Sequence, residues 1–156
     1  MAALRDIIAF FCKNYPHKAE LSKARLTKMV YLSDWKSAIE RKRQISDIKW
    51  VYNHYGPYVD DVANAAQTDP VFEIEAMTNF YGSNKEVVRL KSDRYEPNLT
   101  NAEKEILAYI IAITSTKYWN PFMELVYSTY PILKSQKYSE LDLIALAKEY
   151  TNQQSL

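Results

Sequence analysis

Few residues of this chain have the chemistry of a catalytic or metal-binding site, and they are not arranged in a familiar pattern. The sequence contains one cysteine, Cys12, and two histidines, His17 and His54, which lie far apart. Zinc sites need several Cys or His ligands at short, regular spacing. A lone thiol becomes reactive only in an electropositive setting. We therefore expect Cys12 to be a small core residue and His54 to be packed or hydrogen-bonded.

The carboxylate pair Asp60-Asp61 is the other candidate for chemistry, as metal ligands or as an acid–base pair. Its place at the start of a predicted helix gives a simpler explanation, because the helix dipole favours carboxylates there. The chain also has only two glycines, Gly56 and Gly82. Dinucleotide- and phosphate-binding loops need clustered glycines for close approach of the backbone. We expect no catalytic residue, no cofactor, no metal ion and no enzymatic activity.

Tyrosine is the residue type whose number stands out, with 13 in 156 residues. Its ring offers a large rigid surface with a polar handle and is common among the residues that dominate protein interfaces. Tyrosine also stacks on bases in proteins that bind single-stranded nucleic acid. The core or its edge remains the expected place for most of these side chains.

The most distinctive segment is an aromatic run, Trp50–Tyr55, followed at once by Gly56-Pro57. The run is β-prone and predicts a strand. Gly56 allows an unusual backbone angle, and Pro57 fixes φ and removes a donor. Apolar residues then fall at helical spacing over about Tyr58–Thr68, with Pro57 near the first helical turn, where proline is tolerated. A strand is therefore expected to turn sharply into a helix at a Tyr-Gly-Pro corner.

Apolar periodicity and capping residues predict about six helices. They cover residues 3–14, about 22–43 and about 58–68, and three later segments that begin at Thr100, Asn120 and Ser139. Pro131 is expected just after the end of the fifth helix. In the second helix, Tyr31 and Trp35 lie on a different side from the main apolar residues. A helix that is apolar on two sides is usually packed in the core, and the alternative is that both aromatics anchor a partner.

Two further strands complete the predicted fold. Residues 72–77 alternate between apolar and polar side chains, and residues 86–90 return after a turn over residues 79–84. Together with Trp50–Tyr55 they predict a small antiparallel three-stranded sheet. The expected fold class is α+β, mostly α, in a single domain over residues 1–156 with a core of about residues 4–150.

Charge is unevenly distributed along the chain, although the net charge is only +1. Residues 1–49 hold 11 Lys and Arg against 5 Asp and Glu, a balance of +6, whereas residues 50–156 have a balance of −5. Such asymmetry favours an acidic partner for the first third, either protein or nucleic acid, and a solvated helix face is the alternative. No signal peptide or membrane span is apparent, and one cysteine suits a reducing compartment. We expect a cytoplasmic location and no membrane partner.

Residues 26–34, Leu-Thr-Lys-Met-Val-Tyr-Leu-Ser-Asp, resemble the KL-x-Y-L-x-D helix of the SocA-like antitoxin family, also called the Panacea domain. The run from Trp50 to Tyr58 resembles the strand and Tyr-Gly-Pro motif of that family. Residues 99–107 and 121–126 are similar to its two later helices. The resemblance covers roughly residues 4–150. Family members often carry a Thr-His pair before the last proline, whereas this chain has Thr129-Tyr130 before Pro131.

The resemblance implies an antitoxin of a bacterial or phage two-gene module that neutralises a cognate protein toxin by direct binding. One family member delivers its toxin to a protease, so a protease or a chaperone is a further partner that the resemblance leaves open. Many relatives carry an additional DNA-binding domain, for which this chain leaves no residues. The candidate partner-binding residues are Tyr31, Asp34, Trp35, Tyr55, Gly56, Pro57 and Tyr58.

Two other classes of function stay open at this point. The first is a nucleic-acid-binding regulator that uses the basic residues between Lys13 and Arg43, for which only weak, salt-sensitive binding is expected. The second, ranked last, is a hydrolase. A neighbouring reading frame that is toxic on its own would favour the antitoxin.

Overall fold

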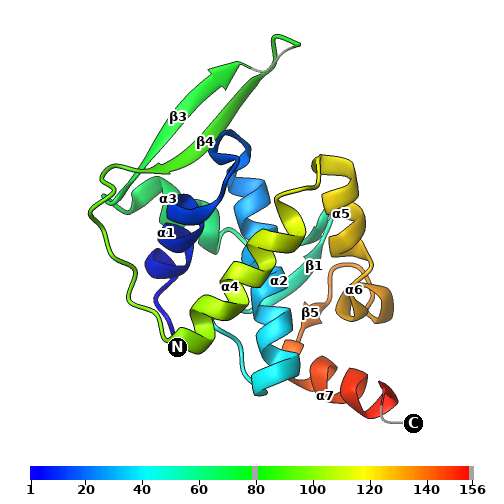
Figure 1. Ribbon diagram of the computed structural model, residues 1–156. Helices are drawn as coiled ribbons and strands as arrows, with labels where there is room; N and C mark the ends of the chain where they lie inside the picture. Colours follow the sequence, from blue (N-terminus) through cyan, green and yellow to red (C-terminus); the bar gives the residue numbers. More distant parts are fainter. Residues whose placement is uncertain (79–80, 155–156) are drawn as a thin grey trace.

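The computed structural model describes residues 1–78 and 81–154 and shows an α+β fold that is mostly α, as predicted (Figure 1). The helices are α1 (Leu4–Asn14), the short 3₁₀ helix η1 (Lys18–Glu20), α2 (Lys23–Arg41), α3 (Asp61–Thr68), α4 (Asn101–Thr114), α5 (Trp119–Tyr127), α6 (Tyr130–Lys134) and α7 (Leu143–Gln154). The strands are β1 (Trp50–Asn53), β2 (Gly56–Pro57), β3 (Phe72–Thr78), β4 (Asn84–Leu90) and β5 (Glu140–Leu141).

Helix α2 runs through the middle of the molecule, and α1, α3, α4 and α7 pack around it (Figure 1). It begins where the sequence predicts, because the Ser22 hydroxyl accepts a hydrogen bond from the Arg25 backbone N–H. Buried residues lie on every side of this helix, including Tyr31 and Trp35. The core position expected for a helix that is apolar on two sides is confirmed.

The predicted three-stranded antiparallel sheet is present, but its strands differ from the prediction. Strand β1 lies between β2 and β5, with Tyr52 opposite Pro57 and Trp50 opposite Leu141. The hairpin over residues 72–90 is not part of this sheet. Strands β2 and β5 are only two residues long, so they carry no alternating pattern from which a strand can be predicted.

The β3–β4 hairpin forms a separate two-stranded sheet that extends away from the helices (Figure 1). Its register, from Phe72 opposite Leu90 to Thr78 opposite Asn84, confirms the predicted antiparallel pair. The Val88 N–H donates to the Leu21 carbonyl and attaches the hairpin to η1 rather than to β1. Of the predicted turn over residues 79–84, residues 79 and 80 lie outside the described part of the chain.

Three helix starts differ from the prediction: α5 begins at Trp119, with Tyr118 rather than Asn120 at its N-cap, and α3 and α7 begin later than expected. Helix α3 begins at Asp61, not near Tyr58, because Pro57 continues the strand pairing and the Tyr58 N–H donates to the Val51 carbonyl. Proline needs no N–H partner at the edge of a sheet. Helix α7 begins at Leu143 instead of Ser139. The helix is capped by Asp142, whose side chain accepts from the Ala145 N–H.

The structure has seven α-helices in its described residues, one more than about six. The additional helix is α6, which begins at Tyr130 with Pro131 in its first turn. A proline after a helix is compatible both with a stop and with a new start, because its fixed φ suits the first helical turn. The capping box at Thr100 and Glu103 is confirmed, since both reciprocal hydrogen bonds are present.

None of the helices in the described residues combines the length and the apolar character that a membrane span requires.

Candidate functional site

Trp50 connects the Tyr-Leu-x-Asp motif on α2 with the strand that leads to the Tyr-Gly-Pro motif. The Asp34 carboxylate, fully buried on α2, accepts hydrogen bonds from the Trp50 indole N–H at 2.9 Å and from the backbone N–H groups of Ile45 and Ser46, each at 2.9 Å. The Ser46 hydroxyl is a fourth donor, at 2.5 Å. Tyr31 meets the Trp50 ring edge-on, with centroids 5.5 Å apart. These contacts fix the start of β1 and so position the corner that follows.

Burial raises the pKa of Asp34 to about 6, because the loss of hydration outweighs the hydrogen bonds from Ser46, Trp50 and Ile45 that favour the carboxylate. At neutral pH the group is ionised, and every neighbour that the hydrogen bonds identify is a donor pointing at it. The hydrogen bonds of the Asp34 carboxylate are therefore fulfilled within the protein, and its role is structural.

The Tyr-Gly-Pro corner is a tight hairpin between β1 and β2, with His54 and Tyr55 at its tip. Gly56 has φ +96°, a left-handed conformation in which a side chain is strained. A Cβ at this position would also lie 3.4 Å from the Tyr127 ring of α5. The glycine is thus required by its backbone angle and by the aromatic ring packed against it.

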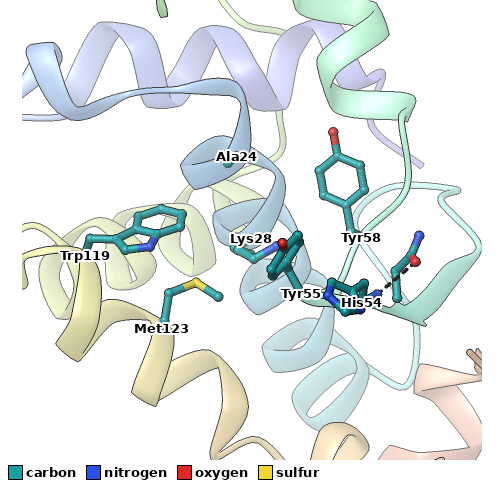
Figure 2. A pocket seen from close by; sticks show the side chains of 8 residues that line it. Ala24, Lys28, His54, Tyr55, Tyr58, Trp119 and Met123 are labelled. Atoms are coloured by element: carbon teal, nitrogen blue, oxygen red, sulfur yellow. Dashed lines mark hydrogen bonds between the residues drawn. The ribbon is translucent and has the colours of Figure 1, made fainter. Parts of the chain in front are cut away.

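This corner forms one wall of a cavity of about 350 Å³, which we call the corner pocket (Figure 2). Helix α2 supplies its floor, the turn after β1 and the residue after β2 supply one wall, and α5 supplies the other. Figure 2 shows the aromatic side chains of the two walls facing each other on either side of the α2 residues. The lining residues are Ala24, Lys28, Asn53, His54, Tyr55, Tyr58, Trp119 and Met123.

The walls are held in place by contacts outside the pocket. Arg25, buried on α2, donates to the carbonyls of Thr114 and Lys117 at 2.8 Å and lies over the Phe122 ring at 4.3 Å. This fixes the turn that leads into α5 and its residue Trp119. On the opposite wall, the His54 ring makes a 3.2 Å hydrogen bond with the Tyr138 hydroxyl, so the bonding expected of His54 is confirmed.

Lys28 lies at the base of the corner pocket and is only 2% exposed. Its ammonium group lies 3.5 Å from the Pro57 carbonyl and 5.2 Å from the centre of the Tyr58 ring. Burial lowers the pKa of Lys28 from 10.5 to about 8. At neutral pH the side chain is still a cation, and it is poorly solvated.

The seven candidate partner-binding residues fall into two groups. Tyr31, Asp34 and Trp35 are buried: the Tyr31 hydroxyl bonds the Thr129 hydroxyl at 2.8 Å, and Trp35 stacks on Tyr130. Gly56 and Pro57 are buried in the hairpin backbone. The residues with exposed ring surface are Tyr55, which is 72% exposed, and the half-buried Tyr58, both in the corner pocket.

Sequence reasoning overlooked Lys28, Trp119 and Met123. Lys28 was visible as a charge within the run from Leu26 to Tyr31, where a lone lysine among core residues is unusual. Trp119, which is 44% exposed, starts α5, and its approach to the Tyr-Gly-Pro corner depends on a contact between segments some 60 residues apart in sequence. No local pattern could have indicated that contact.

Several basic side chains of the first third are ion-paired or buried. Ion pairs join Arg5 to Asp69, Lys13 to Glu96, Lys23 to Glu86 and Lys36 to Glu40. Arg25 and Lys28 are buried. Three of these carboxylates belong to later segments, two of them on the hairpin and the loop after it, and they offset part of the charge excess of residues 1–49.

The remaining chemical candidates lie in ordinary structural positions. Cys12 is buried, as expected, and burial raises its thiol pKa to about 12, which keeps it protonated and unreactive. Asp61 lies in the first turn of α3. Within residues 1–78 and 81–154, no three His, Cys, Asp or Glu side chains come together in an arrangement that could hold a metal ion.

Comparison with known proteins supports the resemblance seen in the sequence. The model of the antitoxin SocA-like family, Panacea domain, matches residues 26–131. No curated protein and no solved structure matches the chain. The matched region covers more than half of the 156 residues and contains most of α2 with its Asp34 network, the Tyr-Gly-Pro corner and every residue of the corner pocket except Ala24. The chain therefore belongs to the SocA-like antitoxin family, characterised by the Panacea domain.

Proposed function

We propose that this chain is an antitoxin that neutralises a cognate protein toxin by binding it directly, with the corner pocket at the centre of the contact. Membership of the SocA-like family supports the antitoxin role. The observation that carries the binding surface is the pair Tyr55 and Trp119, two exposed aromatic side chains on opposite walls of one apolar cavity. Exposed aromatic side chains that become buried on binding are common anchors of protein interfaces.

The size of the pocket suits this role. Its volume of about 350 Å³ is at the lower end of the range of ligand pockets, large enough for one or two side chains of a partner. Tyr118, the residue before Trp119 in the sequence, is 80% exposed. A toxin that inserts a side chain between the walls would cover this surface and exclude water from it. Catalysis has no evident part in such neutralisation.

The test begins by finding the toxin. Each reading frame that flanks the gene is expressed alone and then together with this chain, and we expect one product that is toxic only when expressed alone. The purified pair should form a complex by calorimetry. Absence of any neutralised product among the neighbours would contradict the proposed function.

The contact surface is then tested with Tyr55→Ala and Trp119→Ala. Each should weaken toxin binding by about 30-fold or more, since an anchor residue contributes about 2 kcal/mol, while the melting temperature stays nearly constant. Tyr109→Ala, a 48% exposed tyrosine on α4 next to Lys36, is the matched control and should bind normally. Trp35→Ala serves as the core reference: rescue should fall only in step with stability.

The mode of neutralisation can be separated in the same cells. Direct sequestration leaves the amount of toxin protein unchanged on an immunoblot, whereas delivery to a protease lowers it. Duplex DNA at about 150 mM salt tests the alternative regulator: we expect binding no tighter than the ~10⁻⁴–10⁻⁶ M of non-specific contacts, because several of the basic side chains are ion-paired or buried.

A further inference from the structure

The corner pocket contains a buried positive charge that lacks a counter-ion. The Lys28 ammonium has three N–H donors. Within the described part of the chain, the Pro57 carbonyl is its one hydrogen-bond acceptor, at a long distance of 3.5 Å, and the Tyr58 ring face lies near it. None of the ion pairs formed by the described residues includes Lys28. Burial is the cause that lowers its pKa, and no neighbouring carboxylate opposes that shift.

The position of the Lys28 side chain indicates that it binds a ligand. Lys28 is 98% removed from solvent as a residue, yet it lines the cavity between the two aromatic walls (Figure 2). A buried charge is costly unless it is paired and hydrogen-bonded. In an apolar cavity from which water is excluded, attraction between opposite charges is much stronger than at a wet surface.

We propose that the corner pocket receives a carboxylate of the toxin, carried on an apolar or aromatic segment, and that this carboxylate pairs with Lys28. The inference rests on the proposed function and specifies the chemistry of the partner. A carboxylate matches the single positive charge, whereas a phosphate group would need several cationic or N–H donors. The apolar walls formed by Trp119, Met123 and Tyr55 would hold the hydrocarbon part of the same segment.

The carboxylate preference can be measured without the toxin. The probes are 3-phenylpropionate and its neutral analogue 3-phenylpropanamide, which share the ring and chain and differ in charge. Each is titrated into ¹⁵N-labelled protein while the Trp119 indole N–H signal is followed. We expect saturable shifts with the acid and at least fivefold weaker binding of the amide. The pKa of Lys28, followed through its ¹³Cε shift, should rise when the acid is bound.

The matched variants are Lys28→Met and Lys36→Met, which remove the same charge from the same helix. Lys36 pairs with Glu40 and lies outside the pocket. Lys28→Met should abolish the preference for the acid, and Lys36→Met should keep it. If Lys28→Met does not fold, the wild-type comparison of acid with amide decides alone. Equal binding of the two probes, no binding of either, or an unchanged preference in Lys28→Met overturns the inference.

The toxin itself provides the second arm. Lys28→Met should weaken the complex at least tenfold and Lys36→Met should not. Asp→Asn and Glu→Gln variants of the toxin, and a toxin with its C-terminus amidated, then identify whether the carboxylate is a side chain or the chain end. A complex that forms equally well with Lys28→Met overturns the inference but leaves the proposed function standing. If no toxin is found, the proposed function fails, and the probe titrations still decide the carboxylate preference.

Discussion

Helix α2 carries two buried charges only six residues apart, and their surroundings are opposite. Asp34 is enclosed by donors from the loop after α2 and from the Trp50 indole. Lys28 has one long hydrogen bond and an aromatic ring. Buried polar groups are normally satisfied, and an exception needs an explanation. The satisfied charge stabilises the fold, and the unsatisfied one lies where we propose that the toxin binds.

The comparison also separates the two halves of the family signature. Tyr31 and Asp34 are buried, and they act through Trp50 to position the hairpin. The Tyr-Gly-Pro corner presents Tyr55 at the surface. We infer that the helix motif is scaffold and that the corner, with α5 opposite it, forms the contact.

The largest effect on stability is expected for Asp34→Ala. It leaves the Trp50 indole and the Ser46 and Ile45 N–H groups buried without an acceptor, each at a cost of about 1–3 kcal/mol. We expect urea denaturation to show a loss of about 3 kcal/mol or more in the free energy of unfolding. Asp142→Ala, which removes an exposed cap of α7, should cost about 1 kcal/mol. Similar losses in both variants would remove the special role of Asp34.

A smaller effect is expected for Gly56→Val. The left-handed φ of +96° costs about 1–3 kcal/mol for a side chain, and the new Cβ meets the Tyr127 ring. Thermal denaturation should show a clear decrease in stability, with rescue decreasing in parallel. Gly82→Val is the control, because Gly82 also has a positive φ but has open space around it. If Gly82→Val is as destabilising as Gly56→Val, the Tyr127 contact does not matter.

The smallest effect on stability is expected for Lys28→Met. This outcome would show that the Lys28 charge, unlike that of Asp34, is not needed for the fold. Replacing a poorly paired buried charge with an apolar side chain of similar length is often neutral or stabilising. The folded-state pKa of Lys28 is about 8, below its ordinary 10.5. The unfolded chain therefore binds more protons between these values, and the wild type gains stability as pH rises from 8 to 10.5.

The measurement is the difference in unfolding free energy between Lys28→Met and wild type as a function of pH. We expect the variant's advantage to be constant below about pH 8 and to shrink toward pH 10.5. Lys36→Met should show a small loss of about 0.5 kcal/mol from its helical ion pair with Glu40. A large loss in Lys28→Met at neutral pH would mean that this charge is as structural as Asp34.

Elements that depend on neighbouring residues along the chain could be predicted from the sequence. Ser22 and Thr100 accept hydrogen bonds from N–H groups three residues later, so their caps are readable from local spacing. Local sequence patterns also predicted the unusual backbone angle at Gly56, the antiparallel hairpin and the α+β class. The family signature was likewise visible in short segments of the sequence. Pro131 was ambiguous even locally, because proline is compatible with both the end and the start of a helix.

Features that depend on contacts between distant segments could be known only from the folded chain. Strand β5 pairs with β1 although some 90 residues separate them, and two residues carry no readable period. The corner pocket exists because α5 lies opposite the Tyr-Gly-Pro turn. Asp34 is paired and Lys28 is unpaired because different loops and pocket walls surround the two side chains. The sequence of α2 alone cannot distinguish those two environments, because desolvation and hydrogen bonding are properties of the folded interior.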